Sequence, residues 1–389
     1  MKVLHCITGL SGDGAQRMLL RLTGVLQQRG FSQVVVNLGS PGPLVERFER
    51  EGICVESLKM TSGIGNAAAS LGRLRRIIEE HSPDILQGWM YHANVLLLGS
   101  QVFSQRRSPV VWNIRRGLDD YRELGSMTRL LIRASSYLSG QPSAIIYCSP
   151  DSRRQHENLG FKSTRGLMIE NGFEVERFKP SIKVRQQFRA SLGIHDDDVV
   201  VGIVGRFNIA KGHRYLFEAL ELVAQEEPRV KLVCVGRGML RTTSELHRMI
   251  EKNGLESRVE LLGERGSPEE IYPGLDIYCS SSIGEGFPNA IAEAMSCGVP
   301  CVVTDTGASR ELVDGVGYVV PTRSSSELAG ALVAMVRKKV TERQSLGELS
   351  RQRILERFSL DTIAGRYEKI YRRVSGVAQG RGLYGSEMS

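Results

Sequence analysis

The sequence predicts an α/β protein built from two doubly wound, Rossmann-like domains that face a central cleft. Two observations lead to this prediction. The chain has 389 residues, which is too long for one ordinary hydrophobic core and suits two domains of similar size. Short apolar runs alternate with amphipathic helical runs along the chain, and this alternation is typical of parallel sheets covered by helices.

The first half of the chain carries apolar runs that we expect to form strands near 2–8, 33–38, 53–57, 84–87, 109–114, 144–148 and 166–169. Helical patterns separate most of them, for example at 14–29, 66–81 and 126–140. Residues 1–172 are therefore the predicted first domain. Asn171-Gly172 ends its last strand and Pro180 stops regular structure, which predicts a linker over 173–181.

The second half repeats the plan after a predicted helix at 182–191. A second domain is expected over 182–358, with strands near 199–204, 230–235, 258–262, 275–279, 300–303 and 317–320. A helical segment at 359–375 follows the completed sheet, and we expect it to dock on the first domain. Residues 376–389, rich in Gly and Ser, predict a frayed tail.

Composition narrows the class of protein. Apolar residues make up 41% and charged residues 24%, as in ordinary globular proteins. No apolar run approaches the roughly 20 residues that cross a bilayer, and the first run is too short for a signal peptide, so a cytoplasmic location is expected. Seven cysteines without a C-x-x-C pair predict neither a disulfide framework nor a metal site.

The net charge of +8 is concentrated in the first half of the chain. Residues 1–178 contain 22 Lys and Arg against 16 Asp and Glu, whereas the remainder contains 29 against 27. A basic first domain predicts an anionic partner, although solubilising surface charge gives the same count. Arg129 and Arg133 lie one helical turn apart beside apolar residues, which fits either a membrane-facing edge or a core-packed helix with solvated arginines.

Three segments carry the candidate chemistry, and each follows a predicted strand. The first is Gly9-Leu-Ser-Gly-Asp-Gly14-Ala-Gln16, whose glycines let the backbone approach a ligand and open a helix towards an anion. A dinucleotide-dependent dehydrogenase would have an acid at the end of the second strand for the ribose diol. That strand ends in Val36-Asn-Leu-Gly39, which weakens the NAD alternative without removing it.

The second segment, Gly205-Arg206-Phe-Asn-Ile-Ala-Lys211-Gly212, brings two cations to one turn before a helix. Arg206 as a fork and Lys211 as a point charge can converge on a diphosphate. Two solvated loop cations would give the same pattern.

The third segment is the most specific and contains Glu285-Gly286-Phe287-Pro288-Asn289, followed by Glu293. A buried strand leads into it, and Pro288 marks the first turn of a helix. Glu285 falls in the loop and Glu293 in the helix, so each carboxylate can accept paired hydrogen bonds from vicinal sugar hydroxyls. The free N–H groups near Phe287–Asn289 can hold a phosphate.

Together these segments resemble glycosyltransferase family 4, whose members are retaining enzymes of the GT-B fold. The resemblance covers nearly the whole chain, and Glu285–Glu293 with Gly298-Val-Pro300 is its strongest part. It extends to Gly14-Ala-Gln16, the linker Asn171–Pro180, Gly205–Gly212 and Thr306–Glu311.

The resemblance implies that Arg206 and Lys211 bind the donor diphosphate and stabilise leaving-group charge. It also implies that Glu285 holds the donor sugar and Glu293 the ribose. The remaining implied donor contacts are Gly14, Gly205, Arg265, Gly286, Phe287, Pro288 and Asn289. No metal ion or other cofactor is expected, because two cations and a helix N-terminus would already neutralise the diphosphate.

Two departures from the family concern the acceptor side. Gln16 stands where the family usually has Glu, which bears on loop packing or on acceptor contact. Many relatives carry a catalytic His near the reacting sugar, and here Asn113 or His92 is the candidate; a capping or core role for His92 is the alternative. Arg115 and Arg116 follow Asn113 and are expected, with Gln16 and His92, to contact the acceptor.

The expected reaction is transfer of a hexosyl or N-acetylhexosaminyl group from a nucleotide-diphosphate sugar, UDP before GDP, to a hydroxyl of a glycan or lipid-linked acceptor. The resemblance implies retention by front-face attack, in bacterial surface polysaccharide synthesis, with peripheral contact at the inner face of the membrane and no nucleic-acid partner. A GT-B epimerase or phosphorylase, an NAD-dependent dehydrogenase and a non-catalytic nucleotide-binding regulator are the alternatives.

Overall fold

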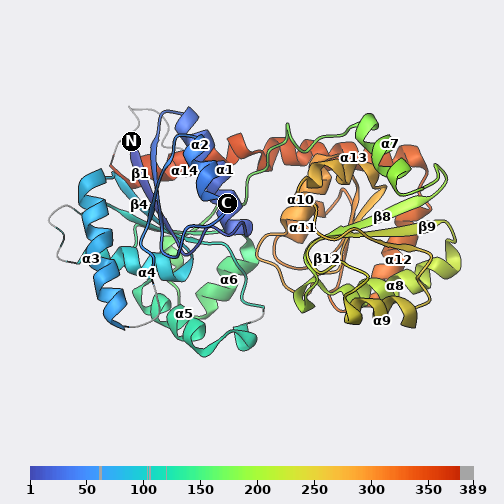
Figure 1. Ribbon diagram of the computed structural model, residues 1–389, viewed down its shortest axis with the longest axis horizontal. Helices are drawn as coiled ribbons and strands as arrows, with labels where there is room; N and C mark the ends of the chain where they lie inside the picture. Colours follow the sequence, from blue (N-terminus) through green and yellow to red (C-terminus); the bar gives the residue numbers. More distant parts are fainter. Residues whose placement is uncertain (61–63, 103, 105–106, 120, 377–389) are drawn as a thin grey trace.

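The computed structural model describes residues 1–60, 64–102, 104, 107–119 and 121–376. Figure 1 shows two α/β domains side by side, each a sheet with helices on both faces. They are joined by the linker and by a long C-terminal helix that runs along one side of the molecule.

The first domain contains a parallel sheet in the order β3-β2-β1-β4-β5-β6-β7. The strands are β1 (Lys2–Ile7), β2 (Ser32–Asn37), β3 (Cys54–Ser57), β4 (Ile85–Trp89), β5 (Val110–Ile114), β6 (Ala144–Tyr147) and β7 (Gly166–Met168). The helices are α1 (Gly14–Gln28), α2 (Val45–Arg50), α3 (Ile64–His81), α4 (Met90–Ser100), α5 (Ser126–Leu138) and α6 (Pro150–Asn158). The order reverses beside β1, which opens a crevice at the carboxyl ends of the strands.

The second domain repeats the plan with the order β10-β9-β8-β11-β12-β13. Its strands are β8 (Val199–Val204), β9 (Val230–Val235), β10 (Val259–Leu261), β11 (Ile277–Ser280), β12 (Cys301–Thr304) and β13 (Tyr318–Val320). Its helices are α7 (Ile182–Ser191), α8 (His213–Glu226), α9 (Ser244–Lys252), α10 (Asn289–Ser296), α11 (Ser309–Val313), α12 (Ser325–Val336) and α13 (Val340–Arg353).

Both sheets are buried on their two faces. Runs such as Val34-Val35-Val36 send alternate side chains to opposite faces, and helices cover each face. Strands of this kind are apolar along their whole length, because neither face meets water. This is why the strands could be predicted from sequence, with ends that shift only slightly.

Helix α14 (Leu360–Val374) leaves the second domain and packs on the first. Its buried Ile363, Tyr367 and Tyr371 lie in the same core cluster as residues of α1 and β1. The chain crosses beside the linker, where Phe173 forms a parallel bridge with Ser359. The tail expected at 376–389 lies, apart from Gly376, outside the described residues.

Candidate active site

A cavity of about 770 Å³ lies between the two domains. Its walls come from loops at the carboxyl ends of both sheets, including those after β1, β5, β8, β9 and β11. Ligands of doubly wound sheets bind at this edge, where helix N-termini present free N–H groups. The volume is in the range of sites that hold small organic ligands. The three segments singled out in the sequence meet in this cavity.

Lys211 and Glu285 form the centre of the second-domain wall. Lys211 Nζ lies 2.5 Å from Glu285 Oε1, and Ser282 Oγ donates to the same oxygen at 2.8 Å. Gly212 has φ 62°, and a Cβ at this position would lie 2.1 Å from the carbonyl oxygen of Ser281. Only glycine therefore lets the loop that carries Lys211 approach the Glu285 loop this closely.

The segment that follows Glu285 contacts the first domain directly. A Cβ on Gly286 would lie 2.7 Å from Arg116 Cα, and Asn171 Nδ2 donates to Asn289 Oδ1 at 2.6 Å. Gly286, Phe287 and Asn289 line the cavity, whereas Pro288 is buried just before the first residue of α10 and does not. The N-terminus of α10 thus points into the space between the domains.

Glu293 projects from α10 into the same cavity and is held from two sides. Burial and the neighbouring Glu293 raise the pKa of Tyr272 well above its usual range, so its hydroxyl stays protonated and donates to Glu293 Oε2 at 2.9 Å. Arg21, from α1 of the first domain, lies 3.5 Å from Glu293 Oε1 and 2.9 Å from the Glu174 carboxylate in the linker. Arg21 was not predicted from sequence, because nothing in the amphipathic pattern of α1 marks it.

Three exposed arginines line the second-domain wall: Arg206, Arg237 and Arg265. Among the described residues, none of their guanidinium groups has a hydrogen bond or ion pair, so the three side chains can meet an incoming anion. Arg206 and Arg265 were predicted, and Arg237 was missed. Its signal is Gly236-Arg237-Gly238 at the end of β9, where a Cβ on Gly236 would lie 2.0 Å from the carbonyl oxygen of Gly205.

The glycine-rich first loop faces the start of α10. A Cβ on Gly14 would lie 3.2 Å from Asn289 Nδ2, so the first loop closely approaches the start of α10, and contact of Gly14 with the donor stays a prediction. Gln16 Oε1 accepts hydrogen bonds from the N–H groups of Gly12 at 2.5 Å and Asp13 at 3.2 Å. Of the two roles considered for Gln16, the structure shows loop packing, and acceptor contact stays a prediction.

Arg115 lines the cavity but is tied to the first domain. Its guanidinium donates to the carbonyl oxygens of Ile169 at 2.7 Å and Glu170 at 3.0 Å and to Asn171 Oδ1 at 2.5 Å. These bonds fix the start of the linker, which leaves Arg115 less able to bind an acceptor than the sequence suggests. Arg116 lines the same wall, with its Nε donating to the carbonyl oxygen of Gly117 at 3.2 Å.

The structure corrects the expectation for Asn113. Its side chain is fully buried and Nδ2 donates to the Tyr367 hydroxyl of α14 at 3.0 Å, so it cannot reach a sugar in the cavity. His92 is exposed on the first turn of α4 and is not among the residues that line the cavity. His92 therefore stays a predicted candidate for the role of the family's cleft histidine, at a position outside the described cavity lining. No pattern in the sequence indicates that α14 covers Asn113.

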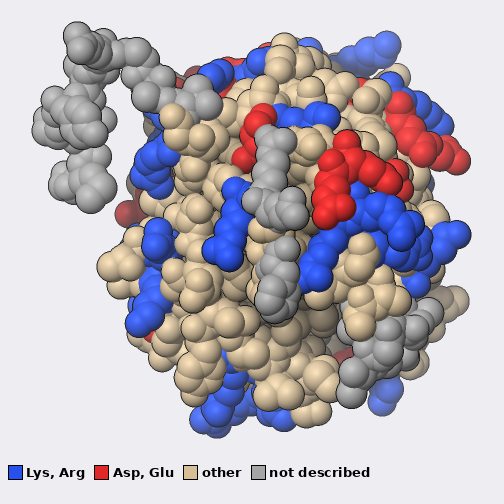
Figure 2. All heavy atoms as spheres, turned by 90° about the vertical axis from the view of Figure 1, so that its left-hand side faces the viewer, with Lys and Arg blue, Asp and Glu red and all other residues tan. Residues whose placement is uncertain are grey.

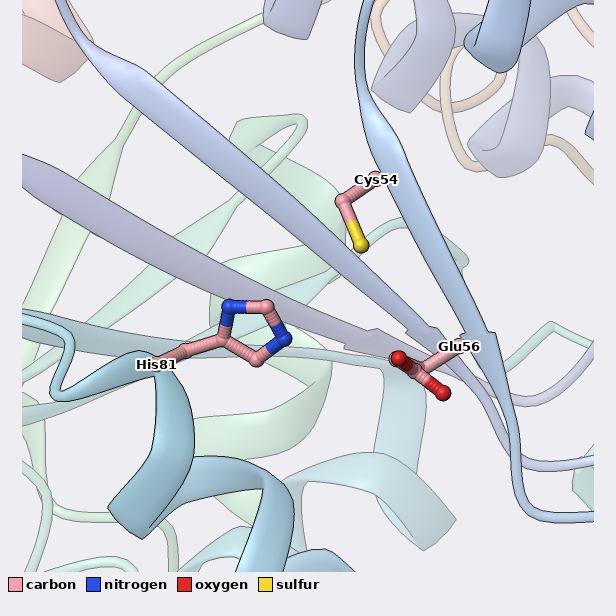
Figure 3. Close-up of side chains that lie close together, drawn as sticks. All are labelled: Cys54, Glu56 and His81. Carbon is pink, nitrogen blue, oxygen red and sulfur yellow. The ribbon is translucent and has the colours of Figure 1, made fainter.

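The described residues contain one group that could hold a metal ion, and it lies outside the cavity. It consists of Cys54, Glu56 and His81, at the edge of the first sheet (Figure 3). The carboxylates that line the cavity, Glu285 and Glu293 among them, do not form such a group. The seven cysteines are free thiols, and only Cys54 is exposed.

Two models of known protein families match this chain. A family model described as Glycosyltransferase Family 4 matches residues 12–177, and one described as Glycosyl transferases group 1 matches residues 198–338. The chain belongs to glycosyltransferase family 4. One model matches most of the first domain and the other most of the second, and together they contain residues 12–16 of the first segment and the whole of the other two.

Curated proteins similar to this chain carry the names of glycosyltransferases. EpsF of Bacillus subtilis is 24% identical over 332 residues, which cover 82% of each chain. The UDP-Gal:alpha-D-GlcNAc-diphosphoundecaprenol alpha-1,3-galactosyltransferase of Escherichia coli is 30% identical over 177 residues, 44% of this chain and 46% of that protein. An uncharacterized glycosyltransferase of Methanocaldococcus jannaschii is 26% identical over 243 residues, and the chain spans only 58% of its length.

Solved structures place the family 4 chain in the GT-B fold. Anabaena HepE, crystallised in complex with UDP, has a TM-score of 0.84 at 25% identity, over 96% of this chain and 100% of that chain. The sucrose-phosphate synthase of Thermosynechococcus elongatus has a TM-score of 0.79 at 18% identity, over 97% of this chain and 100% of that chain.

Proposed function

We propose that this chain is a retaining, metal-independent glycosyltransferase that moves a hexosyl or N-acetylhexosaminyl group from a UDP-sugar to a hydroxyl. The observation that carries the proposal is the pairing of Lys211 with Glu285 beside the N-terminus of α10, in a cavity lined by both domains. A cation that can bind a diphosphate stands there next to a carboxylate that can accept bonds from sugar hydroxyls. The HepE complex supports UDP as the nucleotide.

In this proposal the donor lies along the second-domain wall. The diphosphate occupies the space among Lys211, Arg206 and the N-terminus of α10, where positive charge and free N–H groups converge. The ribose hydroxyls reach Glu293, whose carboxylate Tyr272 and Arg21 hold in place. The base extends towards Arg265, on the loop after β10.

The chemistry then depends on position and charge more than on a protein nucleophile. Glu285 is already an acceptor of bonds from Lys211 and Ser282, which makes it a poor nucleophile. The acceptor oxygen forms its bond to the anomeric carbon on the face from which the UDP leaves, and the configuration is retained. The proton of the acceptor hydroxyl passes to the departing phosphate oxygen, while Lys211 and Arg206 stabilise the charge that develops there.

We place the acceptor on the first domain and propose a lipid-linked one, held at an anionic membrane. Helix α5 exposes Met127, Leu130 and Tyr137 by 71%, 62% and 89%, and their spacing puts them on one face of the helix, beside Arg133. Single exposed apolar residues are ordinary, but a stripe of them beside arginines favours an anionic lipid surface. The E. coli relative, whose printed name includes a diphosphoundecaprenol, supports this acceptor class.

The charge of the first domain fits the same partner. Figure 2 shows basic side chains spread over the end of this domain, whereas the acidic ones gather mainly in its upper half. Among the described residues, no helix is both long and apolar enough to cross a bilayer. The proposed contact is therefore peripheral, through α5 and neighbouring arginines.

The transfer reaction is tested with a panel of UDP- and GDP-sugars as donors and a lipid-diphosphate-linked monosaccharide as acceptor, by measuring release of UDP or GDP in the presence of EDTA. We expect release that requires the acceptor and a product whose new bond keeps the donor's anomeric configuration, read by NMR. Donor turnover without acceptor would instead favour an epimerase, and dependence on free phosphate a phosphorylase. A nicotinamide-dependent absorbance change would favour a dehydrogenase, and donor binding without release a regulator.

The membrane contact is tested separately by sedimentation with vesicles. Vesicles rich in phosphatidylglycerol should bind the protein, and phosphatidylcholine vesicles should not. Reversing Arg133 to Glu should weaken binding by at least about fivefold, because each basic residue near an anionic surface contributes about 1 kcal/mol and the introduced carboxylate adds repulsion. Arg248→Glu, on α9 of the second domain, is the matched control. An equal loss of vesicle binding in both variants would show that α5 does not form the membrane contact.

A further inference from the structure

Cys54, Glu56 and His81 lie together at the outer edge of the first sheet. Cys54 and Glu56 are two residues apart on β3, which is the edge strand, so their side chains share one face. His81 is the last residue of α3, the next helix in the chain. The thiol sulfur, a carboxylate oxygen and an imidazole nitrogen all lie within 4.8 Å of one another. Figure 3 shows the three groups pointing into one gap.

The backbone explains why they meet there. Cys54 pairs in register with Val34 and Glu56 with Val36, and both valines face the core cluster that contains Leu74, Ile77 and Ile78 of α3. Cys54 and Glu56 therefore point to the side of the sheet that α3 covers. The sheet packing that buries α3 also brings its last residue to the edge of β3.

The three side chains have no other partner that explains their convergence. None makes a hydrogen bond or ion pair among the described residues, and the Lys2 ammonium nearby donates to the backbone oxygen of His81 at 2.8 Å. A carboxylate, a thiol and the negative end of a helix dipole gather at one point of a domain whose charge is otherwise positive. This combination suits a cation better than it suits an unliganded surface.

We propose that Cys54, Glu56 and His81 form a Zn²⁺ site, with water as the fourth ligand. Sulfur, nitrogen and oxygen donors together favour Zn²⁺ over Mg²⁺ or Ca²⁺, which prefer oxygen alone. Ligands of tetrahedral zinc lie about 3.3–3.8 Å apart, so small side-chain rotations complete the site. The thiol gives up its proton to water when the metal binds. This site goes beyond the proposed transferase and departs from the sequence-based expectation of no metal.

A metal here would act as a clamp between β3 and α3. It would link an edge strand, which has a neighbour on one side only, to the end of the helix that follows it in the chain. It would also shield the one exposed thiol of the protein. The donor cavity would not be affected, since none of the three residues lines it.

Native-state alkylation tests the site, because six of the seven cysteines are buried and only Cys54 should react quickly. We expect Zn²⁺ to slow alkylation of the full-length protein at least about tenfold, since a coordinated thiolate is a poor nucleophile, and Mg²⁺ to have no effect. Cys54→Ser should abolish the fast reaction. Glu56→Gln and His81→Gln should react quickly with or without Zn²⁺. His247→Gln, which removes an exposed His on α9, should behave like the wild type.

Thermal unfolding tests Zn²⁺ binding at the same site without alkylating the thiol. Zn²⁺ should raise the Tm of the wild type and of His247→Gln but not that of Cys54→Ser or His81→Gln. The proposal is overturned if Zn²⁺ leaves wild-type alkylation and Tm unchanged. It is also overturned if Zn²⁺ protects Cys54 equally in Glu56→Gln and His81→Gln, because the thiol would then bind metal alone.

Discussion

Lys211 and Glu285 are 74 residues apart in the chain and meet within 2.5 Å in the cleft. Each was predicted from its own motif, but their direct pairing could not be, because it depends on how the loops after β8 and β11 lie side by side. The Glu285 carboxylate holds the Lys211 ammonium at the place where we propose that the diphosphate binds. In this proposal Glu285 orients Lys211 for the diphosphate, which removes part of the cost of organising the site.

Replacing Lys211 should therefore affect the chemical step. We expect Lys211→Met to lower kcat by roughly a hundredfold, or about 3 kcal/mol in the barrier, because a preorganised charge that stabilises the leaving group is lost. UDP release at saturating donor measures the change. Lys231→Met, which removes a Lys that donates to Ser257 on the second-domain surface, is the control. Equal kcat in Lys211→Met and wild type would contradict a charge-stabilising role.

Arg21 acts through Glu293 and is a positioning residue. It connects α1 to the proposed ribose-binding carboxylate and to Glu174 of the linker. We expect Arg21→Gln to raise the KM for the donor several-fold with kcat nearly unchanged, because Arg21 orients a binding group and touches no reacting atom. Arg50→Gln removes an exposed arginine from a surface ion pair and should change neither constant. A fall in kcat at constant KM would show a different role.

At the scale of elements, α14 links the two domains and covers residues of the first domain. Its Tyr367 and Tyr371 hydroxyls bond to Asn113 and Gln87 under the carboxyl end of the sheet. The apolar pattern of 360–374 was sufficient to predict a helix that docks. The pattern could not show that Asn113, 254 residues away, would be its partner, and the catalytic role assigned to Asn113 failed for this reason.

Tyr367→Phe separates a structural role of Asn113 from a catalytic one. Removing the hydroxyl leaves the buried Asn113 amide without its acceptor, which should lower the free energy of unfolding by about 1–3 kcal/mol. Urea unfolding measures this loss. The kcat of the folded variant should match the wild type, and a large fall in kcat without loss of stability would restore Asn113 as a catalytic candidate.

At the scale of the whole molecule, three buried histidines make stability depend on pH. Burial lowers the pKa of His5, His156 and His213 to about 4, from an ordinary value of 6.5. Between these values the unfolded chain binds protons that the native protein does not, so the free energy of unfolding should fall as the pH drops from 6.5 to about 4. Urea titrations across this pH range measure the free energy of unfolding. A constant value would mean that the three histidines take up protons within the native protein as readily as in the unfolded chain.

Most of the fold could be predicted because its signals are local. Buried runs such as 34–36 and 200–203 are apolar throughout, and glycine-containing loops follow their strands before the next helices. The site was only partly predictable. Glu285, Glu293 and Lys211 lie within recognisable motifs, and Arg237 lies between two glycines at the end of β9. Arg21 and the Cys54–His81 cluster, in contrast, reach their places through packing between elements. Residues of that kind carry no sequence pattern of their own.

We propose that the cleft binds a UDP-sugar through Lys211 and Glu293 without metal. Calorimetric titration of UDP, a UDP-hexose, GDP and NAD⁺ in EDTA tests it directly, with wild type, Lys211→Met and Glu293→Ala. We expect UDP compounds to bind the wild type preferentially, and each variant to lose about tenfold or more in affinity, since each loses a charged hydrogen-bonding partner. Tighter binding of NAD⁺, or UDP binding unchanged in both variants, would contradict the account.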